Sequence, residues 1–396
     1  MHIRVDGSPI VPGRAGGVEM FTYGLVEGLV EAASHDIEVE VLADTLQQWR
    51  ARVPSDRIRW SGTAMPLRSD RRLGQGLRRY VPLQVRDSRL GRRIVNGLRN
   101  RAQPVREGAD VTVYPFSYVP VRAESSVLVL HDLRRFQAGE PRSGYTEIIE
   151  RNVERAAAIA VSWPHPYQAV LDTFPQARDK TALIPLPTFN ARPTGADAEP
   201  ERGFLIYPSS TAEHKNHATL LEGMSLLPDF RLACPGPLIE PVASTVLGRV
   251  AKPDLAGRVS FPGFVSTEEL ADMYRRAWAV VVPSTWEAAS GAIFEAFSWG
   301  LPVACADVAP LRSQVEFAGG DAAFFEPFDP ASVAAAIEQI TANRDHFAAA
   351  SRRASKRLAD RSWADTARDY VMVCEWVKNG RVGPVPQSSF LAGADS

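Results

Sequence analysis

The sequence has no run of about 18 apolar residues, which excludes a helix that crosses a lipid bilayer. Its three cysteines, Cys234, Cys305 and Cys374, lie far apart in apolar surroundings. That spacing excludes a disulfide scaffold and a cysteine-type zinc site, and it fits a reducing compartment. Residues Met1 to Asp6 lack the basic and then apolar pattern of a secretory leader. We therefore expect a cytoplasmic protein.

The chain also lacks an excess of either charge, because 45 Lys and Arg face 46 Asp and Glu. This balance gives no indication of a nucleic-acid partner. The exception is the stretch from Arg68 to Arg106, which carries twelve arginines, with apolar residues four apart in its second half. One interpretation is an amphipathic helix that makes weak peripheral contact with anionic lipid at the inner face of the membrane. The alternative is a solvated basic helix in a variable insertion.

Short apolar runs alternate with longer amphipathic segments through most of the 396 residues. We expect strands over 1–5, 38–43, 111–114, 127–130, 158–161, 203–207, 230–234, 258–261, 279–282 and 302–305. We expect helices near 144–157, 165–173, 217–227, 239–250, 267–277, 291–299, 331–341, 345–359 and 363–378. This alternation predicts an α/β protein with doubly wound, Rossmann-like parallel sheets, since parallel strands need a crossover.

A proline-rich segment over 186–202 interrupts the alternation and is predicted to be a linker. It separates a first domain over 1–185 from a second over 203–362. A further helix over 363–380 and a disordered tail over 381–396 complete the prediction. Ligands of such sheets bind at the carboxyl ends of the strands, so we expect a substrate in the cleft between the two domains.

Three short motifs follow expected strands. Gly16 and Gly17 close a strand-to-helix loop where backbone N–H groups could approach an anion, although a plain turn looks the same. His131 follows an apolar run, where catalytic groups sit in open sheets; the alternative is a local helix cap by Asp132. Lys215 precedes an expected helix and could neutralise a phosphate, or it is simply solvated.

The densest signal lies over 279–305. A buried strand is followed by a loop that contains Glu287, and a helix is expected to begin near Gly291. Glu295 falls about one turn into that helix, so both carboxylates can face one cleft. The unpaired N–H groups at the start of the helix would point to the same place.

These residues resemble the retaining glycosyltransferases of the GT-B fold, the group that includes glycogen synthase, sucrose synthase and bacterial mannosyltransferases. The hallmark of the group is a pair of glutamates eight residues apart followed by A-x-x-x-G-x-P-V, matched here by Glu287, Glu295, Ala296, Gly300, Pro302 and Val303. The glycine loop, His131, Lys215 and the stretch FPGFVSTEEL fall in the expected order. The resemblance implies two Rossmann-like domains that face each other, with C-terminal helices that pack back toward the first.

The resemblance also implies a role for each residue. Glu295 would bind the ribose of a nucleoside diphosphate sugar, and Glu287 the transferred sugar. Three groups would bind the diphosphate: Lys215, the amides of Gly291 and Ala292, and the Gly16–Gly17 backbone. His131 would contact the sugar from the acceptor-binding first domain, and the backbone near Val265 would read the base. No metal is expected, because a lysine and a helix N-terminus can stabilise the leaving diphosphate.

The implied activity is transfer of a hexose to a hydroxyl acceptor with retained anomeric configuration, by a front-face mechanism. The acceptor would be a glycan, a lipid-linked intermediate or a natural product. Two departures stand out: Ser210 replaces the arginine usual five residues before the lysine, and Ser290 replaces a glycine before the helix. They leave two alternatives open, a nucleotide-sugar epimerase and a sugar-nucleotide-binding protein without turnover.

Overall fold

The computed structural model describes residues 1–12, 16–32, 34–63, 108–118, 120–121, 124–137, 139, 142–188, 192 and 199–392. The arginine-rich stretch, and with it the predicted lipid contact, lies outside the described residues. Across the described ranges, no helix combines the length and apolar character needed to cross a membrane.

The chain forms two compact units. The first comprises residues 1–162, 166–186 and 362–396, and the second comprises 163–165 and 187–361. The chain thus leaves the first unit where the proline-rich segment begins, and it returns to that unit at Ser362.

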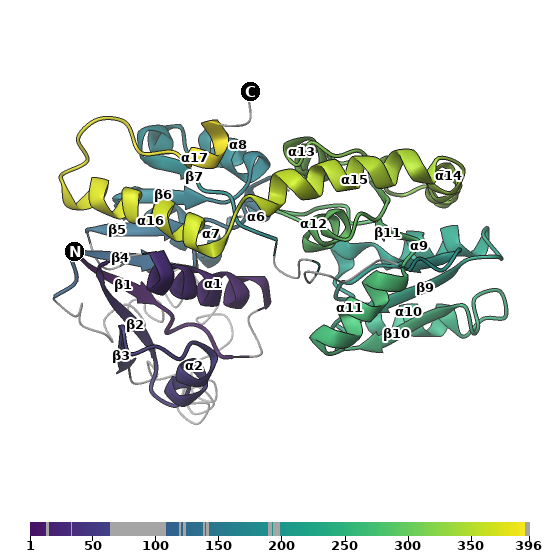
Figure 1. Ribbon diagram of the computed structural model, residues 1–396, viewed down its shortest axis with the longest axis horizontal. Coiled ribbons are helices and arrows are strands. Elements are labelled where there is room, and N and C mark those ends of the chain that lie inside the picture. Colours follow the sequence, from purple (N-terminus) through teal and green to yellow (C-terminus); the bar gives the residue numbers. More distant parts are fainter. Residues whose placement is uncertain are drawn as a thin grey trace, which may run out of the picture. The chain divides into compact units, whose positions relative to one another are not determined.

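The first unit is built on a seven-stranded parallel sheet with the order β3-β2-β1-β4-β5-β6-β7 (Figure 1). Its strands pair in register through buried aliphatic residues, for example Val5 with Val113. The order reverses between β1 and β4, as in doubly wound folds. The strands are β1 (His2–Asp6), β2 (Asp36–Leu42), β3 (Ile58–Thr63), β4 (Val111–Tyr114), β5 (Ser126–Val129), β6 (Ala158–Val161) and β7 (Thr181–Leu183).

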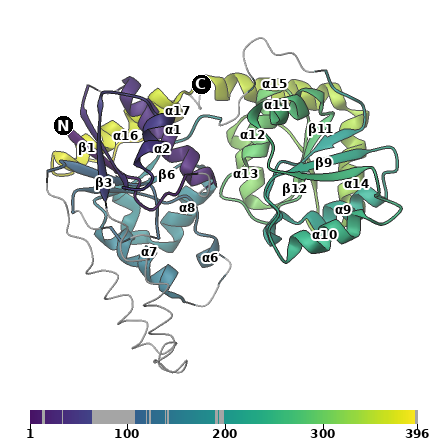
Figure 2. The same cartoon turned by 90° about the horizontal axis from the view of Figure 1, so that it is seen from below.

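Helices cover this sheet, and the last long helix packs beside the first, as Figures 1 and 2 show for α16 and α1. The C-terminal helix thus packs against the first unit, as the resemblance implies. The helical segments are α1 (Gly16–Ala32), α2 (Leu46–Arg52), α6 (Arg134–Gln137), α7 (Gly144–Arg155), α8 (Pro164–Thr173), η1 (Pro175–Lys180), α16 (Trp363–Lys378) and α17 (Ser389–Ala392).

The predicted disorder of the tail is wrong over 381–392. The side-chain amide of Gln387 accepts from the backbone N–H of Leu183 at 2.9 Å, so it pairs with the outer edge of β7. Ser388 donates to the buried carboxylate of Asp369. The apolar residues of the tail show no strand or helix period, and polar pairing of this kind leaves no periodic signal in a sequence.

Two glycines four residues apart let α1 approach α16 closely. A Cβ atom on Gly24 would overlap the Trp363 ring, and one on Gly28 would overlap the Trp363 carbonyl group. Backbone cannot move aside as a flexible side chain can, so Gly28 is the more restrictive position.

We expect Gly28→Ala to destabilise the protein by roughly 1–3 kcal/mol, the usual range for overpacking a tight contact. Gly248 on α10 is the matched control, because a Cβ there meets no atom within 4 Å. Gly248→Ala should stabilise by about 0.5–1 kcal/mol, since alanine favours a helix. Urea unfolding of both variants measures the difference, and equal stability would show that the helices are not in close contact.

The second unit repeats the plan with a six-stranded parallel sheet in the order β10-β9-β8-β11-β12-β13. The two sheets confirm the predicted fold class of paired Rossmann-like units. The order reverses between β8 and β11, whose carboxyl ends therefore form the topological switch point. The strands are β8 (Phe204–Ile206), β9 (Arg231–Pro235), β10 (Val259–Gly263), β11 (Ala279–Val282), β12 (Val303–Ala306) and β13 (Ala323–Phe325).

Helices lie on both faces of this sheet, with α9, α10 and α14 on one side and α11 and α12 on the other (Figure 2). A capping box at Ser266 fixes the start of α11. The helical segments are η2 (Glu213–Lys215), α9 (His217–Ser225), α10 (Val242–Val250), α11 (Thr267–Arg276), α12 (Gly291–Ser298), α13 (Ala309–Phe317), α14 (Pro330–Ala342) and α15 (Arg344–Ala359).

Candidate functional site

An ion pair spans the switch point of the second unit. Lys215 ends the loop after β8, and Glu287 lies in the loop after β11. The Lys215 ammonium group donates to Oε1 of Glu287 over 2.5 Å. The Glu287 side chain is 7% exposed and that of Lys215 is 20% exposed, so the lysine is the member of the pair that solvent reaches more easily. The structure thus brings together two predicted site residues that are 72 positions apart.

Backbone and amide hydrogen bonds fasten the two loops to each other. Thr285 donates its backbone N–H to the His214 carbonyl group at 2.9 Å. Asn216 adopts a left-handed backbone conformation, and its amide donates to the carbonyl groups of Pro283 and Pro327. These hydrogen bonds hold the two loops that carry Lys215 and Glu287 in a fixed position relative to each other.

A buried phenol lies under the pair. The Tyr207 hydroxyl donates to the Lys215 carbonyl group at 3.2 Å and lies 2.7 Å from the hydroxyl of Ser284. Burial raises the pKa of Tyr207, and the nearby Glu287 carboxylate raises it further. The phenol therefore stays protonated and serves as a fixed hydrogen-bonding group.

The start of α12 has no side-chain cap. Gln314 accepts from the Ser290 backbone N–H at 2.8 Å and donates to the Ser290 carbonyl group at 2.7 Å, which fixes the entry to the helix. The Ser290 side chain makes no capping hydrogen bond. The N–H groups of Gly291 and Ala292 thus belong to a helix N-terminus without a side-chain cap, the arrangement that attracts anions.

Glu295 lies one turn into α12 and is buried. Its Oε2 atom accepts from the Tyr274 hydroxyl at 2.6 Å. Burial and the Glu295 carboxylate together raise the pKa of Tyr274 well above its ordinary value. A Cβ atom on Gly291 would lie 3.6 Å from the Glu295 Oε1 atom, so this oxygen is close to the start of the helix.

Val265 lies between β10 and α11, at the same carboxyl-end edge of the sheet, and it is partly exposed. Sequence reasoning missed Tyr207, Tyr274 and Gln314, whose side chains form hydrogen bonds with Lys215, Glu295 and Ser290. None of them lies in a recognisable motif, and their roles depend on packing between separate elements.

Predicted site residues of the first unit also lie at one edge of their sheet. His131 follows β5, and its Nε2 atom lies 3.0 Å from the Pro115 carbonyl oxygen, which makes Nε2 the protonated nitrogen. Burial lowers the pKa of His131, so the ring is neutral near pH 7. The ring of Phe21 from α1 meets it edge-on, with centroids 4.9 Å apart. His131 is thus beside the helix that begins with Gly16 and Gly17.

His217 is a further titratable group near the pair. It is 1% exposed, and neither ring nitrogen has a hydrogen-bond partner among the described residues. Burial, and to a smaller extent the Lys215 charge, lowers its pKa to about 4. It packs between the rings of Tyr207 and Phe261.

This shift predicts a pH-dependent stability. Below pH ~6.5 the unfolded chain binds a proton at His217 that the folded chain binds only near pH 4, so acidification favours unfolding. Between pH 7 and pH 5 the folded state should lose about 2 kcal/mol through this group. We expect His217→Leu to remove that loss, measured by urea unfolding at both pH values. The control is the same substitution at the exposed His346. If the free energy of unfolding changes equally with pH in wild type and in His217→Leu, the pH dependence does not come from His217.

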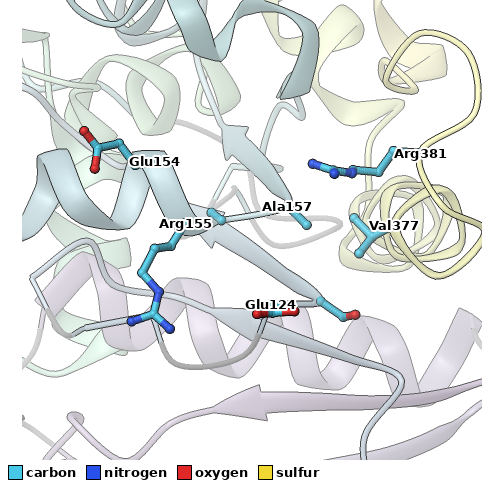
Figure 3. A pocket seen from close by; sticks show the side chains of 8 residues that line it. Glu124, Glu154, Arg155, Ala157, Val377 and Arg381 are labelled. Atoms are coloured by element: carbon cyan, nitrogen blue, oxygen red, sulfur yellow. The ribbon is translucent and has the colours of Figure 1, made fainter.

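A cavity of about 480 Å³ lies elsewhere in the first unit (Figure 3). Its walls include Arg155, Ala157 and Arg381, and Ala157 directly precedes β6. It therefore opens at the amino ends of the strands, opposite the edge that carries His131. Charged groups of both signs surround it, and it contains none of the predicted site residues.

No group of three or more metal-ligating side chains occurs within the ranges that the structure describes. Arg14 and Arg312 are two arginines that could substitute for the one missing at Ser210. Arg312 pairs with Asp307 at 2.6 Å. Arg14, the other candidate substitute, lies outside the described residues.

Residues 195–357 match the family described as glycosyl transferases group 1. O-antigen chain mannosyltransferase B of Escherichia coli is 26% identical over 241 residues, which cover 56% of this chain and 63% of the relative. D-inositol 3-phosphate glycosyltransferase of Thermobispora bispora is 34% identical over 120 residues, 29% of this chain and 28% of the relative. The chain thus spans less than two thirds of either relative.

The fold also has counterparts among solved structures. Sucrose-phosphate synthase from Thermosynechococcus elongatus superimposes with a TM-score of 0.69 at 19% identity, over 96% of this chain and 100% of that one. The match extends over both units, and it confirms the GT-B fold. The family match over residues 195–357 agrees with the resemblance found in the sequence, and retention of the anomeric configuration stays a prediction.

Proposed function

We propose that this chain, whose residues 195–357 belong to the glycosyl transferases group 1 family, transfers a hexose from a nucleoside diphosphate sugar to a hydroxyl acceptor. The proposal includes retention of the anomeric configuration and independence of a metal ion. The name of the E. coli relative supports mannose as the hexose and a growing glycan as the acceptor.

The ion pair of Lys215 and Glu287 at the switch point carries the proposal. A lysine beside a helix N-terminus suits a diphosphate, and a buried carboxylate one loop away suits sugar hydroxyls. Glu295, already fixed by Tyr274, supplies a carboxylate for the ribose. These residues would position the donor and stabilise the leaving diphosphate, which itself would take the proton of the acceptor.

A donor screen tests the proposal. Each of UDP, GDP, ADP and dTDP, with its glucose or mannose derivative, is assayed for nucleotide release with and without mannose-terminated oligosaccharides. We expect release that depends on the acceptor, persists in EDTA, and gives a product whose anomeric configuration, read by NMR, equals that of the donor. Conversion without an acceptor would instead indicate an epimerase. Binding without any turnover would indicate a sugar-nucleotide-binding protein.

A further inference from the structure

We infer that the Lys215–Glu287 pair makes the site selective for a nucleoside diphosphate that still carries its sugar, and that it expels the bare nucleoside diphosphate after transfer. The inference rests on the proposed function, and it concerns how the two residues act on each other rather than which part of the donor each one binds.

In the structure, Lys215 and Glu287 are ion-pair partners of each other. The Lys215 ammonium group lies 2.5 Å from Oε1 of Glu287, and that carboxylate is 7% exposed. A diphosphate that takes the lysine must therefore pull it from the carboxylate. Breaking a buried pair leaves an uncompensated charge, which costs far more than the loss of a surface contact.

Among the residues that the structure describes, no cation other than Lys215 pairs with Glu287. The Tyr207 phenol faces the pair, but it already donates to the Lys215 carbonyl group. Ser210, five residues before Lys215, carries no charge, and Arg312 pairs with Asp307 at 2.6 Å. Glu287 thus depends on Lys215 until another hydrogen-bond donor arrives.

A complete nucleotide sugar supplies that donor. Its diphosphate takes Lys215, and its sugar hydroxyls donate to the Glu287 carboxylate, so both residues exchange one partner for another. The bare nucleoside diphosphate replaces only one of the two partners. Once the sugar has moved to the acceptor, the pair re-forms and the nucleotide product is released.

Titration calorimetry without acceptor tests this inference on the full-length chain. Wild type should bind the nucleotide sugar about tenfold or more tightly than the matching nucleoside diphosphate. Glu287→Gln has no pair to break, so its affinity for the nucleoside diphosphate should rise by roughly five- to tenfold, while the preference for the sugar form disappears. Glu213→Gln, an exposed carboxylate two residues before Lys215, removes the same charge without touching the pair and should change either affinity by less than about twofold.

Weaker or unchanged binding of the nucleoside diphosphate by Glu287→Gln overturns the inference while leaving the proposed function intact. Failure of wild type to bind any member of the panel overturns the proposed function and the inference with it. A second measurement needs no variant: excess free glucose or mannose should tighten binding of the nucleoside diphosphate to wild type, because the sugar satisfies Glu287. If neither sugar changes that affinity, the inference is wrong even where Glu287→Gln does not fold.

Discussion

Lys215→Ala is expected to slow sugar transfer on the order of 10²–10³-fold, the usual cost of removing one group that stabilises developing charge. The diphosphate gains negative charge as the sugar leaves, and the lysine lies at the switch point where that charge would develop. A neutral side chain removes the lysine charge and leaves uncharged backbone N–H groups, such as those of Gly291 and Ala292, to stabilise it. Steady-state kinetics with saturating donor measure the change.

The same substitution leaves the buried Glu287 without its cation, so folding must be checked beside activity. Thermal unfolding with and without donor separates a misfolded variant from a slow one. Lys252→Ala removes an exposed lysine of the same unit and should leave the rate within about twofold of wild type. A rate reduced by less than about threefold in Lys215→Ala would show that the diphosphate binds elsewhere.

The periodic elements could be predicted closely because their signals are local. The apolar run over 279–282 and the helix over 363–378 have the same bounds in the structure. The strands β7 and β13 were missed, since three residues are too few to show a period. Helix α13 was missed because its buried face is short and includes the polar Gln314 beside Leu311 and Val315.

The site could be predicted in part, because parallel sheets place strand ends at one edge. This rule put Lys215 and Glu287 in loops at the same edge, but their direct contact depends on β8 lying beside β11. The hydrogen bond from Tyr274 to Glu295 could not be predicted, since it needs the packing of α11 against α12. The residues that lie in motifs, such as Glu287 and Glu295, could thus be predicted from the sequence. Their supporting contacts, such as that of Tyr274, became apparent only in the structure.

Glu295→Ala is expected to weaken donor binding by roughly 10–10²-fold, because a carboxylate that accepts from ribose hydroxyls forms charge-assisted hydrogen bonds. The rate at saturating donor should fall much less, since the ribose lies away from the reacting bond. Calorimetry with the nucleotide sugar and with the bare nucleoside diphosphate should show similar losses for both ligands, because both contain the ribose.

Tyr274 separates this binding role from a structural one. Tyr274→Phe removes the hydrogen bond at 2.6 Å but keeps the Glu295 carboxylate. It should therefore lower the stability by about 1–3 kcal/mol but reduce the donor affinity less than Glu295→Ala does. Glu316→Ala, an exposed carboxylate on α13, serves as the control for charge alone. Donor affinity that stays within about twofold of wild type in a folded Glu295→Ala protein would show that Glu295 does not bind the ribose, and that its carboxylate only supports Tyr274.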